Sequence, residues 1–268
     1  MKVNGVDFMV GADPEFFVKK DGIVQSAFGL IQGTKFNPFK VNKGAVQVDG
    51  MALEYNIDPA SSPEEFYENL TSVRDQLLNM IPGYEVEDKS SVVFDEEVFN
   101  KQPLEATLLG CEPDFNGWSM DVSNPPDASG RMRTAGGHVH VGGFHCNDPS
   151  NHSHFQTCGR LARIMDETLG IYSLLWDYDD KRRSMYGKAG CFRPKTYGME
   201  YRTLSNKWIF QGRLTQFVFS AVEESLKKMF DPNYQPNPEV EHIINESDRS
   251  HPLLKTPRAD EVRAIVES

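Results

Sequence analysis

Four short segments of the sequence place acidic, imidazole or guanidinium side chains two residues apart, a spacing that could assemble a reactive site. The pairs are Asp13 with Glu15, Glu54 with Asn56, His138 with His140, and Glu200 with Arg202. Side chains two apart share one face of a β-strand, and apolar residues take the alternate positions of each segment. If the four strands lie in one sheet, that sheet has an apolar face for helices and a polar face lined by Glu15, Glu54, His138 and Glu200.

Several carboxylates on one face repel each other and would be partly protonated unless a cation compensates them. Carboxylate-rich ligation with one imidazole suits Mg²⁺ or Mn²⁺ better than a structural zinc. The sequence therefore predicts a divalent metal site. The alternative for the His138-Val-His140 motif is a pair of polar histidines on the solvent-facing side of a half-exposed sheet.

A basic segment runs from Lys181 to Arg213 and holds nine Lys or Arg against the single acid Glu200. It carries +8, whereas the whole chain carries −11, which leaves −19 for the rest. A positive island in an acidic chain is a candidate site for an anion, and metal with guanidinium groups is the combination used in phosphoryl transfer. The residues expected to contact a polyphosphate are Arg182, Arg183, Lys188, Arg193 and Arg202. The alternative is a solvated basic loop.

The net charge of −11 makes nucleic acid an unlikely partner and opposes binding to anionic membranes. The sequence has no run approaching the ~18 apolar residues of a membrane span, and its first residues do not resemble a signal peptide. The four cysteines are scattered without a CxxC pair, so we expect reduced thiols and a cytoplasmic location. Cys111 and Cys191 stand beside the motifs but are expected to be buried fillers.

The elements that must position these residues follow from periodicity and turn signals. We expect strands over 6–20 (broken at Asp13-Pro14), 23–27, 45–56 (turning at Asp49-Gly50), 90–94, 134–144 and 197–204. We expect helices from the Ser61-Ser62-Pro63 cap to about Met80, then over 155–177, 214–229 and 258–267. Strands and helices without strict βαβ alternation predict an α+β fold, a mainly antiparallel sheet with helices on one face. One domain is expected over 1–268, with a C-terminal helical tail over about 231–268.

At these motifs the sequence resembles a known family, the phage-type carboxylate–amine ligases of type 2, within the glutamine synthetase and glutamate–cysteine ligase superfamily. The resemblance extends from Gly11 to about Trp208. Its markers are Gly-Ala-Asp13-Pro-Glu15, Gln47-Val-Asp49-Gly, Glu54-Tyr-Asn, Gly110-Cys111-Glu-Pro-Asp114, Arg133-Thr-Ala-Gly-Gly-His138, and Tyr201-Arg202-Thr-Leu-Ser-Asn206. It implies a sheet curved into a half-funnel, with ATP entering at one end and an amino-acid substrate at the other.

The resemblance also implies roles for individual residues. The implied metal ligands are Glu15, Asp13, Glu54, His138 and Glu200, with Asp49 as a helper of Glu54. Asp13 stands where relatives often carry Glu, which leaves its direct ligation open. The implied contacts to ATP or an acyl phosphate are His140, Arg202, Arg193, Arg183 and Lys188, and the residues implied in catalysis itself are Glu200, Arg202 and Arg193.

The activity implied is ATP-dependent amide formation with Mg²⁺ or Mn²⁺, through an acyl phosphate that an amine then attacks. The competing hypotheses are a metal-dependent amidase or other hydrolase, and a non-catalytic nucleotide-binding relative. An amino-acid- or peptide-like substrate is expected, but the sequence does not identify it. Residues 111–118 and 124–126 are expected to form loops, either beside a substrate pocket or as ordinary connections.

Overall fold

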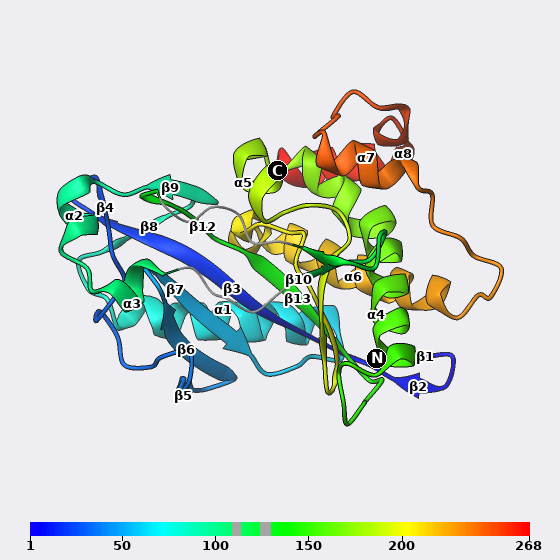
Figure 1. Ribbon diagram of the computed structural model, residues 1–268, viewed down its shortest axis with the longest axis horizontal. Coiled ribbons are helices and arrows are strands. Elements are labelled where there is room, and N and C mark those ends of the chain that lie inside the picture. Colours follow the sequence, from blue (N-terminus) through cyan, green and yellow to red (C-terminus); the bar gives the residue numbers. More distant parts are fainter. Residues whose placement is uncertain (109–113, 124–129) are drawn as a thin grey trace.

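The computed structural model describes residues 1–108, 114–123 and 130–268, and its centre is one large open sheet (Figure 1). The sheet has eleven strands in the order β11-β10-β14-β15-β13-β3-β7-β6-β5, with β4 and β8 also pairing β3. Every pairing in it is antiparallel. This confirms the predicted α+β fold with a mainly antiparallel sheet.

The strands and helices have the following bounds. The strands are β1 Lys2–Val3, β2 Val6–Asp7, β3 Met9–Lys20, β4 Ile23–Gln25, β5 Phe39–Val41, β6 Gly44–Asp49, β7 Ala52–Ile57, β8 Glu85–Glu87, β9 Ser91–Val93, β10 Asp114–Asn116, β11 Val122–Ser123, β12 Met132–Thr134, β13 Gly137–Gly142, β14 Cys191–Lys195 and β15 Gly198–Tyr201. The helices are α1 Pro63–Asn79, α2 Glu96–Asn100, α3 Leu104–Thr107, α4 His152–Met165, η1 Asp166–Gly170, η2 Ile171–Leu175, α5 Asp180–Met185, η3 Asn206–Phe210, α6 Gly212–Met229, α7 Glu239–Asn245, η4 Pro252–Leu254 and α8 Pro257–Val266.

Strand β3 is the long central strand, and it is not broken at Asp13-Pro14 as the sequence predicted. The N–H of Glu15 bonds Gly136 O on the β13 side at 2.9 Å, so the backbone of Pro14 faces β7 instead. The register between β3 and β7 begins beyond this point, at Glu15↔Glu54. Proline is therefore tolerated here, because its missing N–H lies at a position where β3 does not yet pair with β7.

Two tight turns connect the strands around β3 and β6, and the one at Asp49-Gly50 was predicted. Asp21 and Gly22 join β3 to β4 with φ of 52° and 77°, the left-handed pair that a two-residue hairpin requires. Gly50 joins β6 to β7 with φ of 58°. These tight connections fix the register of the strands that carry Glu15 and Glu54.

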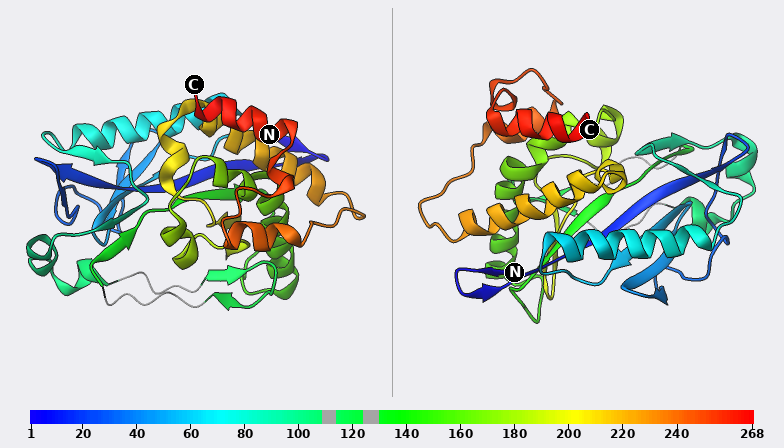
Figure 2. Two further views of the ribbon diagram at one scale, coloured as in Figure 1. Left: turned by 90° about the horizontal axis from the view of Figure 1, so that it is seen from above. Right: turned by 180° about the vertical axis from the view of Figure 1, so that it is seen from behind.

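Helices α1 and α6 cover the apolar face of the sheet (Figure 2, right). Helix α1 begins where predicted, with Ser62 accepting a hydrogen bond from the N–H of Glu65 and Pro63 in the first turn. Its buried side chains recur at helical spacing and meet the alternate apolar residues of the strands in one core. The opposite face of the sheet is therefore left for the polar side chains.

The helix predicted over 155–177 begins at His152 and changes form after Met165, into the π-helical η1 and the 3₁₀-helical η2. Asp166, fully buried at the change, accepts hydrogen bonds from Trp118 Nε1 and Tyr201 Oη, both at 2.6 Å. Burial raises the pKa of Asp166 to about 7 although these bonds act against it. The buried carboxyl group of Asp166 thus connects this irregular part of the helix to Tyr201 on β15.

The basic segment is structured, and its strand β14 was not predicted. Cys191, Arg193 and Lys195 take one face of β14, and Phe192 packs into the core on the other. Pro194 lies beyond the end of the β10 register, which stops at Phe192, so its missing N–H breaks no pairing there.

The C-terminal region holds α7, η4 and α8, which pack on η1, η2 and α6 (Figure 1). The terminal helix lies within one residue of its prediction and is capped by Thr256. None of the helices in the described part of the chain combines the length and apolarity needed to cross a membrane. Three cysteines, Cys146, Cys158 and Cys191, are free thiols, and Cys111 lies outside the described residues.

Candidate active site

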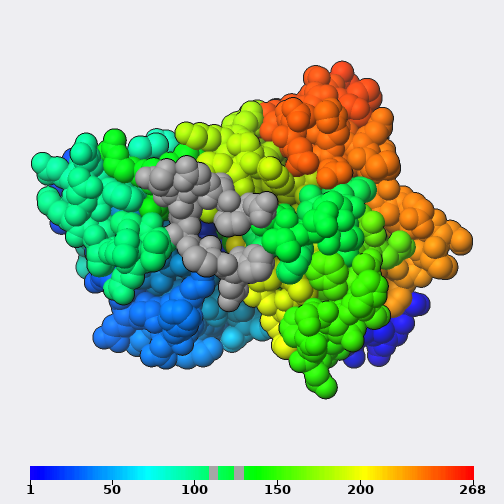
Figure 3. Space-filling view, viewed as in Figure 1, coloured from blue at the N-terminus to red at the C-terminus, as the bar shows by residue number. Residues whose placement is uncertain are grey.

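A cavity of about 810 Å³ lies on the polar face of the sheet, which is the face that Figure 3 views. All four predicted pairs contribute to its wall, so the prediction that the four strands present their polar residues to one face is confirmed. The lining residues on or directly after strands of the sheet include Asp13, Glu15, Gln47, Asp49, Glu54, Asn56, Asp114, Asn116, His138, His140, Cys191, Arg193, Lys195, Glu200 and Arg202.

One carboxylate group lies where β3 meets β7. Glu15 and Glu54 are directly opposed in the register, and Asp49 follows on β6, so that one oxygen of each lies within 4.8 Å of the others. Gln47 Nε2 donates to Glu54 at 2.6 Å, Gly136 N donates to Glu15 at 2.8 Å, and Lys35 Nζ lies 3.2 Å from Asp49. Lys35 is thus the one cation paired with this group among the described residues.

The pKa directions in this group show that its negative charge is not fully compensated. Burial raises the pKa of Glu54 well above its ordinary value, and repulsion by Asp13, Glu15 and Asp49 raises it further. Burial likewise raises the pKa of Glu15. A divalent cation bound here would favour the ionised form of these carboxyl groups and so lower both pKa values.

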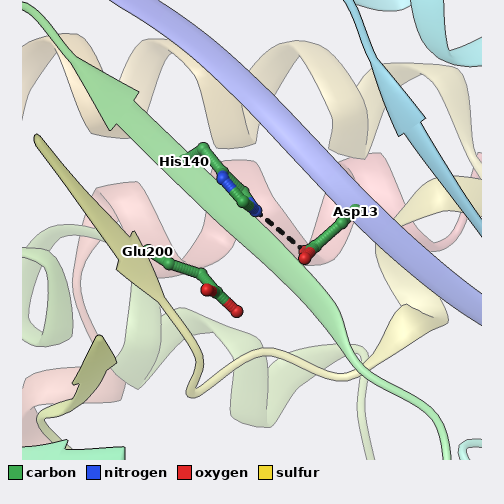
Figure 4. Close-up of side chains that lie close together, drawn as sticks. All are labelled: Asp13, His140 and Glu200. Carbon is green, nitrogen blue, oxygen red and sulfur yellow. Dashed lines mark ion pairs between the residues drawn. The ribbon is translucent and has the colours of Figure 1, made fainter. Parts of the chain in front are cut away.

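A second group lies across β3, β13 and β15 and consists of Asp13, His140 and Glu200 (Figure 4). Strand β13 lies between the two acids, because His138 is opposite Asp13 in one register and His140 is opposite Glu200 in the other. His140 Nε2 is 3.0 Å from Asp13 Oδ1, and His140 Nδ1 bonds the hydroxyl of Tyr197. Burial acts to raise the pKa of Asp13, but the two histidines outweigh it and hold this pKa well below its usual range.

His138 lies beside the same group, but one of its ring nitrogens also contacts a cationic side chain. Its Nδ1 is 3.3 Å from Asp13 and 3.5 Å from Glu200, but it also lies 3.2 Å from Arg202 Nη1, a donor. Burial, followed by Arg202, lowers the pKa of His138. The geometry therefore gives both histidines access to the acids, and leaves Nε2 of His140 as the nitrogen less engaged by a cationic neighbour.

The far wall of the cavity is cationic and is formed by β14 and the end of β15. Lys195 Nζ lies 3.0 Å from Glu200, and Arg202 forms an ion pair with the same carboxylate. Arg193 and Arg202 both contact Asp114 Oδ1, at 2.8 and 2.9 Å. These cations surround Glu200 and Asp114, so the charge of Glu200 is balanced, whereas the Asp13 carboxylate of the same group lies against the two histidines.

The structure separates the predicted arginines of the basic segment. Arg182, Lys188, Arg193 and Arg202 line the cavity. Arg183 instead is buried against Ser173 and Asp177, 3.4 Å from the Asp177 carboxylate, as part of the support for α5. Because Arg182 and Arg183 are adjacent on a short helix, their side chains diverge.

Arg182 lines the cavity from helix α5 and has no acidic partner among the described residues. Its guanidinium donates to Ala135 O, Thr203 O and Leu204 O at 3.0, 3.1 and 2.7 Å. Burial lowers its pKa to about 10. It thereby joins the segment before β13 to the segment after β15.

The residues fit a divalent cation by a further observation. Asp13 Oδ1 and His140 Nε2 are buried, and neither has a hydrogen-bond partner of good geometry among the described residues, although they lie 3.0 Å apart. Oxygen-rich groups with an imidazole are donors that Mg²⁺ and Mn²⁺ accept. A cation held between such atoms would satisfy both of them.

Several residues of the site were not singled out by the sequence. Asp114 was only part of a motif, Lys195 only a charge in the basic segment, and Tyr197 only a strand residue. Asp114 lies within the stretch 111–118 that was predicted as a loop, but Asp114–Asn116 form strand β10, which pairs with β11 and β14. Residues 111–113 of that stretch and the second predicted loop, 124–126, lie outside the described residues. Cys191 lines the cavity but is buried, and burial raises the pKa of its thiol to about 12, as expected of a filler rather than a nucleophile.

Residues 129–240 match the family described as "Phage phiEco32-like COOH.NH2 ligase-type 2". The match confirms the family resemblance for this part of the chain, less than half of its length, which includes His138, His140, Arg193, Glu200 and Arg202. The resemblance of the segments before residue 129 stays a prediction. The family is a carboxylate–amine ligase by its description, which supports a ligase activity in general terms. No curated protein matches the chain.

Proposed function

We propose that this protein is an ATP-dependent carboxylate–amine ligase that forms an amide through an acyl phosphate and requires Mg²⁺ or Mn²⁺. One observation carries the proposal. A single cavity of about 810 Å³ has a carboxylate group with little positive charge beside it on one side and a wall of cationic side chains on the other. A metal–polyphosphate complex needs both, since the carboxylates bind the cation and the guanidinium groups bind the phosphates. The family match is consistent with this reaction class.

The proposed metal ligands are Glu15 and Glu54, with Asp49, in the first group, and Asp13 and Glu200, with His138 or His140, in the second. A bound divalent cation would supply charge neutralisation to the phosphates. Arg193, Arg202 and Lys188 are proposed to contact phosphate oxygens. Arg183 is excluded from this role by its buried pairing with Asp177, and Arg182 is better placed to add positive potential behind the site.

In the proposed reaction a substrate carboxylate oxygen attacks the γ-phosphorus of ATP, the bond to the β,γ-bridging oxygen breaks, and ADP leaves. The acyl phosphate is then attacked at its carbonyl carbon by an amine, which loses a proton as the amide forms and inorganic phosphate departs. Arg193 and Arg202 are oriented by Asp114 and are positioned to stabilise the charge on the transferring phosphoryl group. No protein nucleophile is needed.

The proposal is tested by calorimetry of ATP binding with Mg²⁺, together with a screen of amino acids and peptides for ADP release. We expect ATP binding that requires the metal, and ADP release only when a carboxylate and an amine are both present. Product formation without ATP would instead identify a metal-dependent hydrolase. ATP binding without turnover for any pair would favour a non-catalytic relative, and absence of both binding and turnover would refute the proposal.

A further inference from the structure

The turn between β14 and β15 carries Tyr197 to the second acidic group. Lys195 pairs with Gly198, so Thr196 and Tyr197 form a two-residue turn. Gly198 has φ of 152°, and a Cβ there would lie 2.0 Å from Val141 O, so glycine is required for the turn to approach β13. The turn is held by Gly143 N donating to Tyr197 O at 3.1 Å and by Cys146 N donating to Thr196 O at 2.8 Å.

This turn places the Tyr197 side chain against the imidazole of His140. The two rings stack with centroids 5.9 Å apart and planes 20° apart, and the Tyr197 hydroxyl bonds Nδ1 of His140. The other ring nitrogen, Nε2, is the atom that faces Asp13. One side of the imidazole is thus fixed by Tyr197, and the other is presented to the acidic group.

The tautomer of His140 decides what Nε2 can do. A neutral imidazole has one protonated nitrogen and one lone pair, so Nε2 can bind a cation only when the proton is on Nδ1. A proton on Nδ1 needs an acceptor at this partly buried position, and the Tyr197 hydroxyl can accept as well as donate. His138 differs, because its Nδ1 lies 3.2 Å from the Arg202 donor.

We propose that Tyr197 is a positioning residue for the metal site, its hydroxyl oxygen accepting a hydrogen bond from Nδ1–H of His140 so that Nε2 presents its lone pair between Asp13 and Glu200. This inference rests on the proposed function in so far as that function uses the second group to bind a divalent cation. Partners of this kind typically change metal affinity 10–100-fold when removed. The role is distinct from packing, since phenylalanine would keep the ring and lose only the hydroxyl.

The test compares Tyr197→Phe with the wild type, using Mn²⁺ binding followed by electron paramagnetic resonance. Tyr178→Phe, at a tyrosine 69% exposed on the surface, is the matched control, and His140→Gln identifies the affected site. In parallel, ¹⁵N spectra of histidine-labelled protein with saturating Mg²⁺ report which nitrogen of His140 carries the proton. Circular dichroism confirms that both tyrosine variants are folded.

We expect Tyr197→Phe to weaken the same Mn²⁺ site as His140→Gln by about 10–100-fold, with Tyr178→Phe unchanged. We also expect His140 in the wild type to be protonated at Nδ1 and not at Nε2 when Mg²⁺ is bound. Equal Mn²⁺ affinity in Tyr197→Phe and wild type, or a proton retained on Nε2 with Mg²⁺, overturns the role of Tyr197 alone. A wild type that binds no Mn²⁺ overturns the metal dependence of the proposed function as well.

Discussion

Glu54→Gln should have opposite effects on stability with and without a divalent cation. Without the cation, the substitution removes a buried charge from a group whose ligand oxygens lie within 4.8 Å of one another. At that separation and an effective dielectric constant of about 20, two full charges repel by ~3 kcal/mol. Above the folded pKa of Glu54, where this repulsion is present in the wild type, we expect the variant to be more stable by about 1–3 kcal/mol in EDTA.

The pH dependence of this effect has a definite sign. The pKa of Glu54 is raised in the folded protein, so the native state binds more protons than the unfolded chain just above the ordinary carboxyl pKa. Wild-type stability therefore falls as pH rises through this range, and the loss is complete above the folded pKa. The amide introduced by Glu54→Gln does not titrate, so the advantage of the variant should grow with pH and then level off.

The assay is urea unfolding followed by circular dichroism from pH 4.5, the ordinary carboxyl pKa, to about pH 8.5, in EDTA and in excess Mg²⁺. A ligand at about 1,000 times its Kd adds ~4.1 kcal/mol to the state that binds it, so the wild type should overtake a variant that has lost the site when Mg²⁺ is present at that excess. Glu97→Gln, at an exposed i,i+4 pair with Lys101, is the control. A variant less stable than wild type in EDTA at every pH, with an unchanged response to Mg²⁺, would refute the reasoning.

Three further predictions concern the second group and the core. Glu200→Gln should abolish ATP turnover while leaving the unfolding midpoint within a few degrees of wild type, and full activity in this variant would remove Glu200 from the site. Arg193→Met should raise the KM for ATP by about 10–150-fold, since one charge-assisted contact is worth ~1.5–3 kcal/mol; an unchanged KM in steady-state kinetics would place the phosphates elsewhere. Asp166 has a folded pKa of about 7, so it costs wild-type stability as pH rises from about 4 to 7, by at most ~4 kcal/mol. Asp166→Asn should flatten that dependence in urea unfolding, and an unaltered slope would show that Asp166 is ionised throughout.

The sequence predicted the polar face of the sheet because β-strand alternation is a strong local signal. Glu54, His138, Glu200 and their partners two residues on each follow a period of two, and the structure places them on one cavity wall. The start of α1 could equally be predicted from the sequence, since the Ser62 cap and Pro63 are local determinants of a helix start. The antiparallel fold class followed from the same turns and periods.

What the sequence did not predict depends on tertiary contacts. Strand β14 is short and contains Pro194, so its strand signal is weak, and its pairing with β10 and β15 fixes it instead. The divergence of Arg182 and Arg183 cannot be seen in a run of basic residues, because burial of one against Asp177 decides it. The nearness of Asp49 to Glu15, and of His140 to Asp13, likewise depends on strand register.

The central claim is that ATP activates a carboxylate, and hydroxylamine trapping tests it most directly. Hydroxylamine replaces the unidentified amine, a pool of amino acids and short peptides supplies the carboxylate, and hydroxamate and ADP are measured together with Mg²⁺ present. The account predicts hydroxamate formed in equal amount with ADP, dependent on ATP and lost in Glu200→Gln. Hydroxamate formed without ATP, or none from any acid by protein that binds ATP with Mg²⁺, would contradict it.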